Sequence, residues 1–164
     1  MPTDRAALLQ QITATSEYLK QLTGNLDDAT LDFHPEPEAW NTREVLAHLV
    51  DDEMFIMRTR LERMIKEDHP TLAPHDEKHW YATRNTRRDQ RDELLADFEQ
   101  QRVASLGILT LLRESDWQRT AFHPEYGTFT VEGWLAIWAE HDRNHVEQIA
   151  QNIRRCHEAR GSAQ

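Results

Sequence analysis

The chain has 164 residues, a formal net charge of −10, and 38 % hydrophobic and 29 % charged residues. This length fits one domain, expected over residues 1–164, and suffices to bury a core. A strongly acidic surface opposes binding to phosphate backbones, so no nucleic-acid partner is expected. The sequence lacks an apolar run of about 18 residues and the basic-then-apolar order of a secretory signal, so we expect a cytoplasmic protein with no membrane partner.

The first predicted helix runs from about Asp4 to Thr23. Leu8, Ile12, Leu19 and Leu22 share one face of it. Gly24-Asn25 then supplies a helix C-cap. Leu26 to Ala39 follows as a connection rich in acids and prolines, because proline disfavours helix in the residue before it.

The second predicted helix begins after Asn41, which is a favourable N-cap. Glu44, three residues later, completes a capping-box pattern. We expect this helix to continue to about Glu67. Its inward residues are Val45, Leu49, Phe55, Ile56 and Leu61.

Two further helices are predicted after a proline-containing loop over Asp68–Tyr81. The third should span about Asn85 to Glu114, and a connection over Ser115–Thr128 should follow it. Thr130 is the expected N-cap of the fourth helix, which carries Val131, Trp134, Leu135, Trp138, Ile149 and Ile153 on one face. Four amphipathic helices with long connections indicate an all-α four-helix bundle, a fold that places metal sites between facing helices.

Histidines on two of these helices form the main candidate site. His141 and His145 stand four residues apart, so a helix directs both imidazoles to one side. Both continue the inward stripe of the fourth helix, and His48 lies among apolar residues of the second. Unpaired buried polar groups are costly. A shared metal ion would satisfy all three histidines, although such a pair is often only two polar residues on a helix face.

Other polar residues near these histidines allow several roles. Asp52 follows His48 by four residues and shares its face, so it is a candidate fourth ligand, general base or supporting partner, or else a surface acid at the bundle edge. His69, His75 and His79 lie in the proline-containing loop. We expect a solvent-facing loop there, with the alternative that it covers a pocket.

Two blocks of this sequence resemble the DinB-like (DinB/YfiT) family of metalloenzymes. Residues 40–53, WNTREVLAHLVDDE, are similar to the family stretch W-S-x-x-E-x-L-x-H-L-x-x-x-E. Residues 141–149, HDRNHVEQI, are similar to the family ending H-x-R-x-H-x-x-Q-I. Helix number, helix order and length also match, so the likeness covers nearly the whole chain.

The resemblance implies an up-up-down-down bundle, frequently a homodimer, with a divalent metal held by His48, His141 and His145. Imidazole ligands suit zinc, nickel, iron or cobalt about equally, so the identity of the metal stays open. Three histidines would leave a coordination position for water or substrate, as catalytic sites do. No particular catalytic residue is identified.

Three functions are compatible with this site. The first expectation, from the resemblance, is an enzyme that transfers a low-molecular-weight thiol to a small electrophilic substrate. The second is a metal-dependent hydrolase, and the third is a non-catalytic metal-binding module of a stress response. A fold shared by many chemistries does not choose among them.

Overall fold

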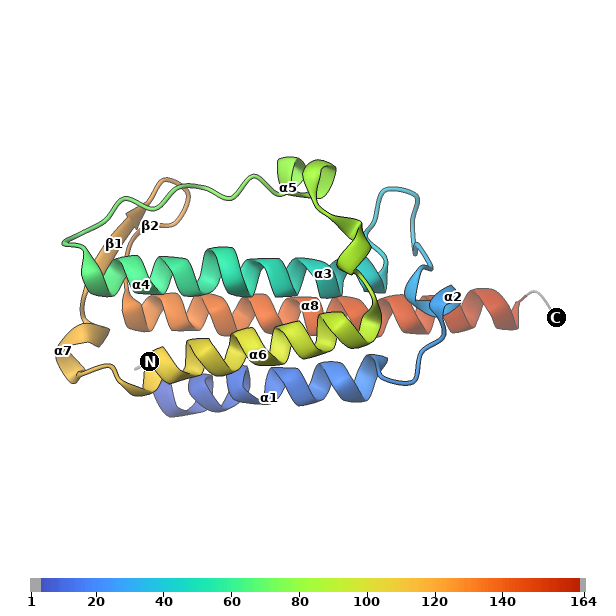
Figure 1. Cartoon of the computed structure of the whole chain (residues 1–164), viewed down its shortest axis with the longest axis horizontal. Helices are drawn as coiled ribbons and strands as arrows, with labels where there is room; N and C mark the ends of the chain where they lie inside the picture. Colours follow the sequence, from blue (N-terminus) through green and yellow to red (C-terminus); the bar gives the residue numbers. More distant parts are fainter. Residues whose placement is uncertain (1–3, 163–164) are drawn as a thin grey trace.

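The computed structural model describes residues 4–162, and four long helical segments lie side by side along its long axis (Figure 1). The predicted all-α four-helix bundle is confirmed. The long segments are α1 (Arg5–Thr23), α3 (Thr42–Asp52) continued by the π-helix η1 (Glu53–Met57) and α4 (Arg58–Lys66), α6 (Arg91–Thr110), and α8 (Val131–Gly161). The short elements are α2 (Asp28–Leu31), α5 (Glu77–Thr83), the 3₁₀-helix η2 (Thr86–Arg88), α7 (Glu114–Trp117), and the strands β1 (Thr120–His123) and β2 (Gly127–Thr130).

The predicted caps position the helix starts. Asn41 accepts a hydrogen bond from the Glu44 backbone, and the Glu44 side chain accepts one from the Asn41 backbone, which completes the capping box of α3. Thr130 accepts a hydrogen bond from the backbone of Gly133 and starts α8. These bonds satisfy backbone N–H groups that have no partner within the helix. The short-range signals in the sequence therefore fix where the helices bearing the histidines begin.

Helix direction differs from the simple order suggested by the resemblance. In Figure 1, α1 and α8 run one way, while the α3–α4 segment and α6 run the other. Each of α1 and α3 packs against both α6 and α8. The order up, up, down, down therefore holds around the bundle (α1, α8, α3, α6), but along the chain the helices run up, down, down, up.

This arrangement explains the long connection before α6. Since α4 and α6 run parallel, the chain must return along the full length of the bundle between them. Residues 67–90 do so on the outside, and α5 lies over α3 (Figure 1). The expected loop over Asp68–Tyr81 thus contains the start of a helix, because Asp76 caps α5 by accepting a hydrogen bond from the His79 backbone.

The third helix and the connection after it also need correction. The expected span Asn85–Glu114 contains η2 and then the shorter α6, because Arg84 and Asp89 pair across the turn that precedes Arg91. The connection Ser115–Thr128 contains α7 and an antiparallel hairpin in which Ala121 pairs with Phe129. Gly127 has φ +72°, a conformation that a glycine adopts without strain.

The π-helix η1 changes the register of the second helix. A π-turn accommodates one extra residue, so the residues around it are rotated relative to a straight α-helix. Phe55 was expected to face inward, but it is 60 % exposed. Arg60 and Met64, beyond the π-helix, are buried instead. Leu61, which was also expected to face inward, is fully buried, so the expectation fails at Phe55 and holds at Leu61.

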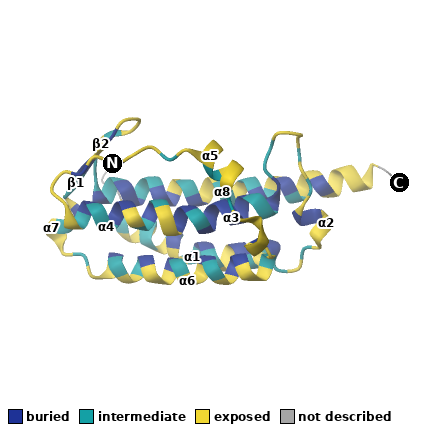
Figure 2. Ribbon diagram, turned by 45° about the horizontal axis from the view of Figure 1, so that its top comes forward, coloured by how far each residue is buried: buried dark blue, intermediate teal, exposed yellow. Residues whose placement is uncertain are grey.

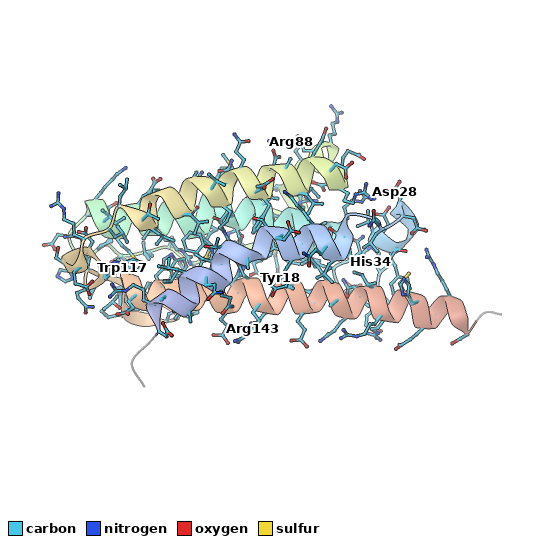
Figure 3. The ribbon with its side chains drawn as sticks, turned by 90° about the horizontal axis from the view of Figure 1, so that it is seen from below. Tyr18, Asp28, His34, Arg88, Trp117 and Arg143 are labelled. Atoms are coloured by element: carbon cyan, nitrogen blue, oxygen red, sulfur yellow. The ribbon has the colours of Figure 1, made fainter. Side chains whose placement is uncertain are left out.

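The core lies between the long helices, and their solvent-facing sides carry the exposed residues (Figure 2). Trp134 and Trp138 are the largest fully buried side chains and fill the half of the core toward the hairpin. Trp117 lies at that end of the bundle, whereas Asp28 and His34 lie at the opposite end (Figure 3). None of the described helices is both long enough and apolar enough to cross a bilayer.

Candidate metal centre

The structure brings His48 of α3 together with His141 and His145 of α8. One ring nitrogen from each lies within 4.8 Å of the others, and the Nε2 atoms of His48 and His141 are 3.4 Å apart. The ring centroids of His141 and His145 are 4.5 Å apart, as expected for residues one helical turn apart on one face. All three predicted ligands therefore converge on one point between two antiparallel helices.

Asp52 joins this cluster and is not a surface acid. Its side chain is buried, and its Oδ2 atom lies 3.5 Å from His48 Nε2 and 3.3 Å from His141 Nε2. Its Oδ1 atom has no hydrogen-bond partner among the described residues. Asp52 is the last residue of α3, and the π-helix begins directly after it.

The protonation of the three imidazoles differs because their surroundings differ. Burial lowers the pKa of His48 to about 3, so this ring is neutral. Burial, and then the charge of His141, also lower the pKa of His145. Burial disfavours charge on His141 as well, but hydrogen bonding and charge from Asp142 and Asp52 outweigh it and raise its pKa to about 9. The surroundings therefore favour the charged form of His141 and the neutral forms of His48 and His145.

Polar groups behind the imidazoles orient them. The Nδ1 atom of His145 is 2.9 Å from Gln148 Oε1, and donation to this oxygen leaves the Nε2 lone pair free for the centre of the cluster. The Nδ1 atom of His141 is 3.8 Å from Asp142 Oδ1. Adjacent residues of an α-helix project about 100° apart, so Asp142 does not share the face of His141. Its buried carboxylate nevertheless contributes to the high pKa of that imidazole.

A buried ion network supports the site from the opposite side of the bundle. Arg102 of α6 donates to both carboxylate oxygens of Glu53, at 3.0 and 2.9 Å, and to Asp142 Oδ2 at 2.6 Å. Trp138 donates to Glu53 Oε2 at 3.0 Å. Glu53 and Asp142 each directly follow a residue of the cluster, Asp52 and His141. The sequence pattern did not reveal this network, because Arg102 lies within an ordinary amphipathic helix.

Aromatic side chains cover His48. The ring centroids of Trp40 and Trp80 lie 4.9 and 5.2 Å from that of His48. Trp80 belongs to α5, and its indole N–H donates to Asp51 Oδ2 at 2.6 Å. We call residues 67–90, which return along the outside of the bundle, the crossover. The crossover therefore covers one side of the site, in line with the alternative expectation that this loop covers a pocket.

The three histidines of the crossover have different positions. His75 reaches the cluster, with its Nε2 atom 3.4 Å from Asp52 Oδ1. His69 and His79 are exposed, and His69 contacts the hydroxyl of Thr120. The expectation of solvent-facing histidines therefore holds for His69 and His79 and is wrong for His75.

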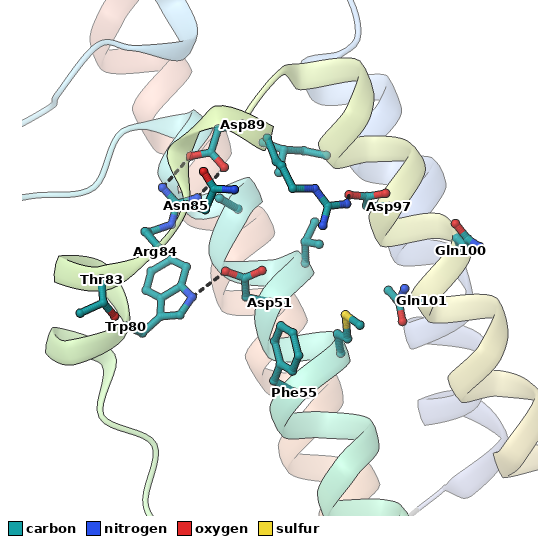
Figure 4. Close-up of a pocket in the computed structure, with 15 residues that line it drawn as sticks. Asp51, Phe55, Trp80, Thr83, Arg84, Asn85, Asp89, Asp97, Gln100 and Gln101 are labelled. Carbon is teal, nitrogen blue, oxygen red and sulfur yellow. Dashed lines mark hydrogen bonds and ion pairs between the residues drawn. The ribbon is translucent and has the colours of Figure 1, made fainter.

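One pocket opens onto the cluster. It has a volume of about 430 Å³, and both Asp52 and His141 line it. A second pocket, of about 450 Å³, lies between α3 and α6 under the end of the crossover (Figure 4). Trp80, Arg84 and Asp51 line that pocket, but none of the three clustered histidines does. The first pocket is therefore the route by which a small molecule could reach the histidines.

The distances among His48, His141 and Asp52 fit a divalent metal ion, and a ring nitrogen of His145 lies within 4.8 Å of the other two imidazoles. Four ligands at about 2.0–2.1 Å from a tetrahedral ion are separated by about 3.4 Å. The triangle formed by His48 Nε2, His141 Nε2 and Asp52 Oδ2 has sides of 3.4, 3.5 and 3.3 Å. Nitrogen and oxygen donors of this kind suit zinc and its neighbours in the first transition series. The residues present therefore form a donor set appropriate for such an ion.

Fold and site together define a helical bundle with a candidate three-histidine metal centre between two of its helices. The chain belongs to the DinB superfamily, whose model matches residues 11–149. It is 29 % identical to the "Putative metal-dependent hydrolase OB0782" of Oceanobacillus iheyensis, over 90 % of this chain and 84 % of that protein. It is 25 % identical to the "Putative metal-dependent hydrolase YfiT" of Bacillus subtilis, over 90 % of this chain and 83 % of that protein.

A solved structure of Bacillus subtilis YfiT shares the fold. The TM-score is 0.84 at 24 % sequence identity, covering 94 % of this chain and 89 % of that one, and YfiT is described as having an unusual four-helix bundle topology. The likeness supports the bundle described above, including its parallel neighbouring helices.

Proposed function

We propose that this protein is a metal-dependent hydrolase that binds a divalent ion through His48, His141 and His145. The observation that carries the proposal is the convergence of three imidazoles and one carboxylate at the end of an accessible pocket. Relatives that cover most of this chain are named as metal-dependent hydrolases, which supports the same reaction class.

The chain's own residues would hold and orient the reacting groups. A divalent ion bound here would act as a Lewis acid on a substrate oxygen and lower the pKa of water. Asp52 would accept a proton at Oδ1, an oxygen that has no hydrogen-bond partner in the described part of the chain and lies 3.4 Å from His75 Nε2. Trp40 and Trp80 exclude solvent from the His48 side, so the pocket on the His141 side is where substrate would enter.

Turnover of activated esters and amides tests the proposal. The purified protein, loaded separately with zinc, nickel, iron and cobalt, should hydrolyse at least one substrate without added thiol. The His145→Ala variant should lose this activity, and the His157→Ala variant should keep it, because His157 is an exposed residue of the same helix. Absence of turnover with every metal across the panel would contradict a hydrolase.

Thiol transfer remains a prediction that the same assay separates from hydrolysis. A thiol transferase would consume an epoxide or alkyl halide only when a low-molecular-weight thiol is added. We favour hydrolysis, because the relatives carry that name and because a carboxylate able to accept a proton lies in the site.

A non-catalytic metal module has one observation in its favour. Asp52 Oδ2 lies where it could occupy a fourth position and close the site. The pocket lined by Asp52 and His141 supports access instead. The absorption spectrum of the cobalt-loaded protein tests this, because adding an anionic ligand such as azide should change the spectrum of an accessible ion and leave that of a closed site unaltered.

A further inference from the structure

The pocket beside the histidine cluster contains a largely buried arginine. Arg60 of α4 lines the pocket together with Asp52 and His141, and its residue exposure is only 9 %. Among the described residues, no carboxylate lies within ion-pair distance of its guanidinium. Arginine is rarely buried to this extent without an ionic partner, because an uncompensated charge loses its hydration.

Three groups hold this guanidinium in a fixed orientation. It lies over the ring of Trp134, 5.3 Å from the centroid, and its Nη2 atom donates to the carbonyl oxygen of Ala73 at 2.7 Å. His123 approaches Nη2 at 3.3 Å. The aromatic face and the carbonyl together fix the plane of the group.

His123 does not neutralise Arg60. Its Nδ1 atom accepts a hydrogen bond from the Glu125 backbone at 3.2 Å, so in the neutral ring Nε2 carries the proton. The histidine therefore contributes a second N–H group beside the guanidinium and no negative charge.

The remaining donors of Arg60 are available to a ligand. Only Nη2 has a hydrogen-bond partner among the described residues, and Nε and Nη1 keep access to solvent. A planar guanidinium with free donors binds a carboxylate through two parallel hydrogen bonds. The acidic residues of the pocket other than Asp52, namely Glu77, Glu125 and Glu140, are exposed and form its rim. An acidic rim disfavours multiply charged anions and permits a single carboxylate.

We infer that the pocket binds small substrates through one carboxylate group held by Arg60, with the scissile group directed toward His141 and Asp52. The position of the scissile group rests on the proposed hydrolase function. Binding of the carboxylate does not, since Arg60 is separate from the histidine cluster and its orientation depends on Trp134 and Ala73.

Binding to the metal-free protein tests the inference without relying on catalysis. The probes are N-acetylglycinate and its neutral analogue N-acetylglycine methylamide, with affinity measured by NMR titration following the indole N–H of Trp134. The chelator-treated wild-type protein should bind the carboxylate at least tenfold more tightly than the amide. Equal affinity for the two probes, or no binding of either, would overturn the inference.

Two matched variants locate the binding group. Arg60→Gln should weaken N-acetylglycinate binding about tenfold or more and remove the preference over the amide. Arg58→Gln makes the same charge change two residues earlier, where the side chain contacts α6 through Gln101, and it should bind like wild type. Unchanged carboxylate affinity in folded Arg60→Gln would refute the assignment.

If Arg60→Gln does not fold, the difference in wild-type affinity between N-acetylglycinate and the neutral amide still tests the inference. Arg60→Lys, which retains the charge but lacks the planar fork, then serves as a second variant with an expected intermediate affinity. Carboxylate binding in a protein that hydrolyses no ester or amide would support the Arg60 site and contradict the proposed hydrolase. Hydrolysis with no preference for carboxylate-bearing substrates would support the proposed hydrolase and contradict the Arg60 site.

Discussion

Arg102 donates a 2.6 Å hydrogen bond from Nη1 to Oδ2 of Asp142 and so links α6 to α8. The same guanidinium binds Glu53 of the second helix. Both carboxylates are sequence neighbours of residues in the histidine cluster. The position of the cluster therefore depends on an ion network that lies outside it.

Arg102→Met should destabilise the protein strongly. Loss of the guanidinium would leave two buried carboxylates without a counter-charge, a change that typically costs about 3–5 kcal/mol. Chemical denaturation measures the free energy of unfolding. Arg143→Met, at an exposed position of α8, is the control and should change it by less than about 0.5 kcal/mol. A loss below about 1 kcal/mol in Arg102→Met would show that the network is not required for folding.

The same network predicts how stability depends on pH. Burial alone would raise the pKa of Asp142, but the charge of Arg102 outweighs it and lowers the pKa below its ordinary value. A carboxylate with a lowered pKa in the folded state stabilises the protein above its unfolded-state pKa, and that contribution is lost as the pH falls through the folded-state pKa. The free energy of unfolding should therefore fall less between pH 6 and pH 3 in Asp142→Asn than in the wild-type protein. Stability curves that fall equally over this interval in the variant and in wild type would contradict this account.

Alanine substitution of each clustered histidine should abolish or greatly weaken metal binding. A site with three imidazole ligands loses an essential donor in each case. Metal content of the purified His48→Ala, His141→Ala and His145→Ala proteins, measured by mass spectrometry, tests the assignment. His157→Ala should keep the wild-type content, and full metal in all three variants would mean that the ion binds elsewhere.

Asp52→Asn separates a supporting role from a ligand role. If Asp52 accepts a proton during turnover, the variant should retain close to one metal ion per chain, with affinity lowered by about 10–100-fold at most. Its hydrolytic activity should fall at least a hundredfold. Metal content comparable to that of the histidine variants would instead identify Asp52 as a ligand.

The sequence was sufficient to predict the four long helices, the capping box at Asn41 and the shared face of His141 and His145. These features depend on local signals: Asn41 and Glu44 close a helix start within one turn, and His141 and His145 share a face through helix geometry alone. That the three imidazoles bind a metal stays a prediction.

Features that depend on contacts between distant residues were not predictable from the pattern. Phe55 lies in the π-helix Glu53–Met57 and is exposed, and Arg60 beyond it is buried, although both sit in an unbroken helical sequence. His75 reached Asp52 only because the crossover returns along the bundle.

By itself, the sequence determined the four long helical segments, the capped starts of the helices that carry the histidines, and the shared side of His141 and His145, because these properties follow from backbone geometry and short-range hydrogen bonds. Only the tertiary structure decided helix direction, the burial of Asp52, the pairing of Arg102 with Glu53 and Asp142, and the burial of Arg60 without an ion-pair partner among residues 4–162. These depend on how distant segments compete for the same buried volume and on which charges the packing leaves without a partner.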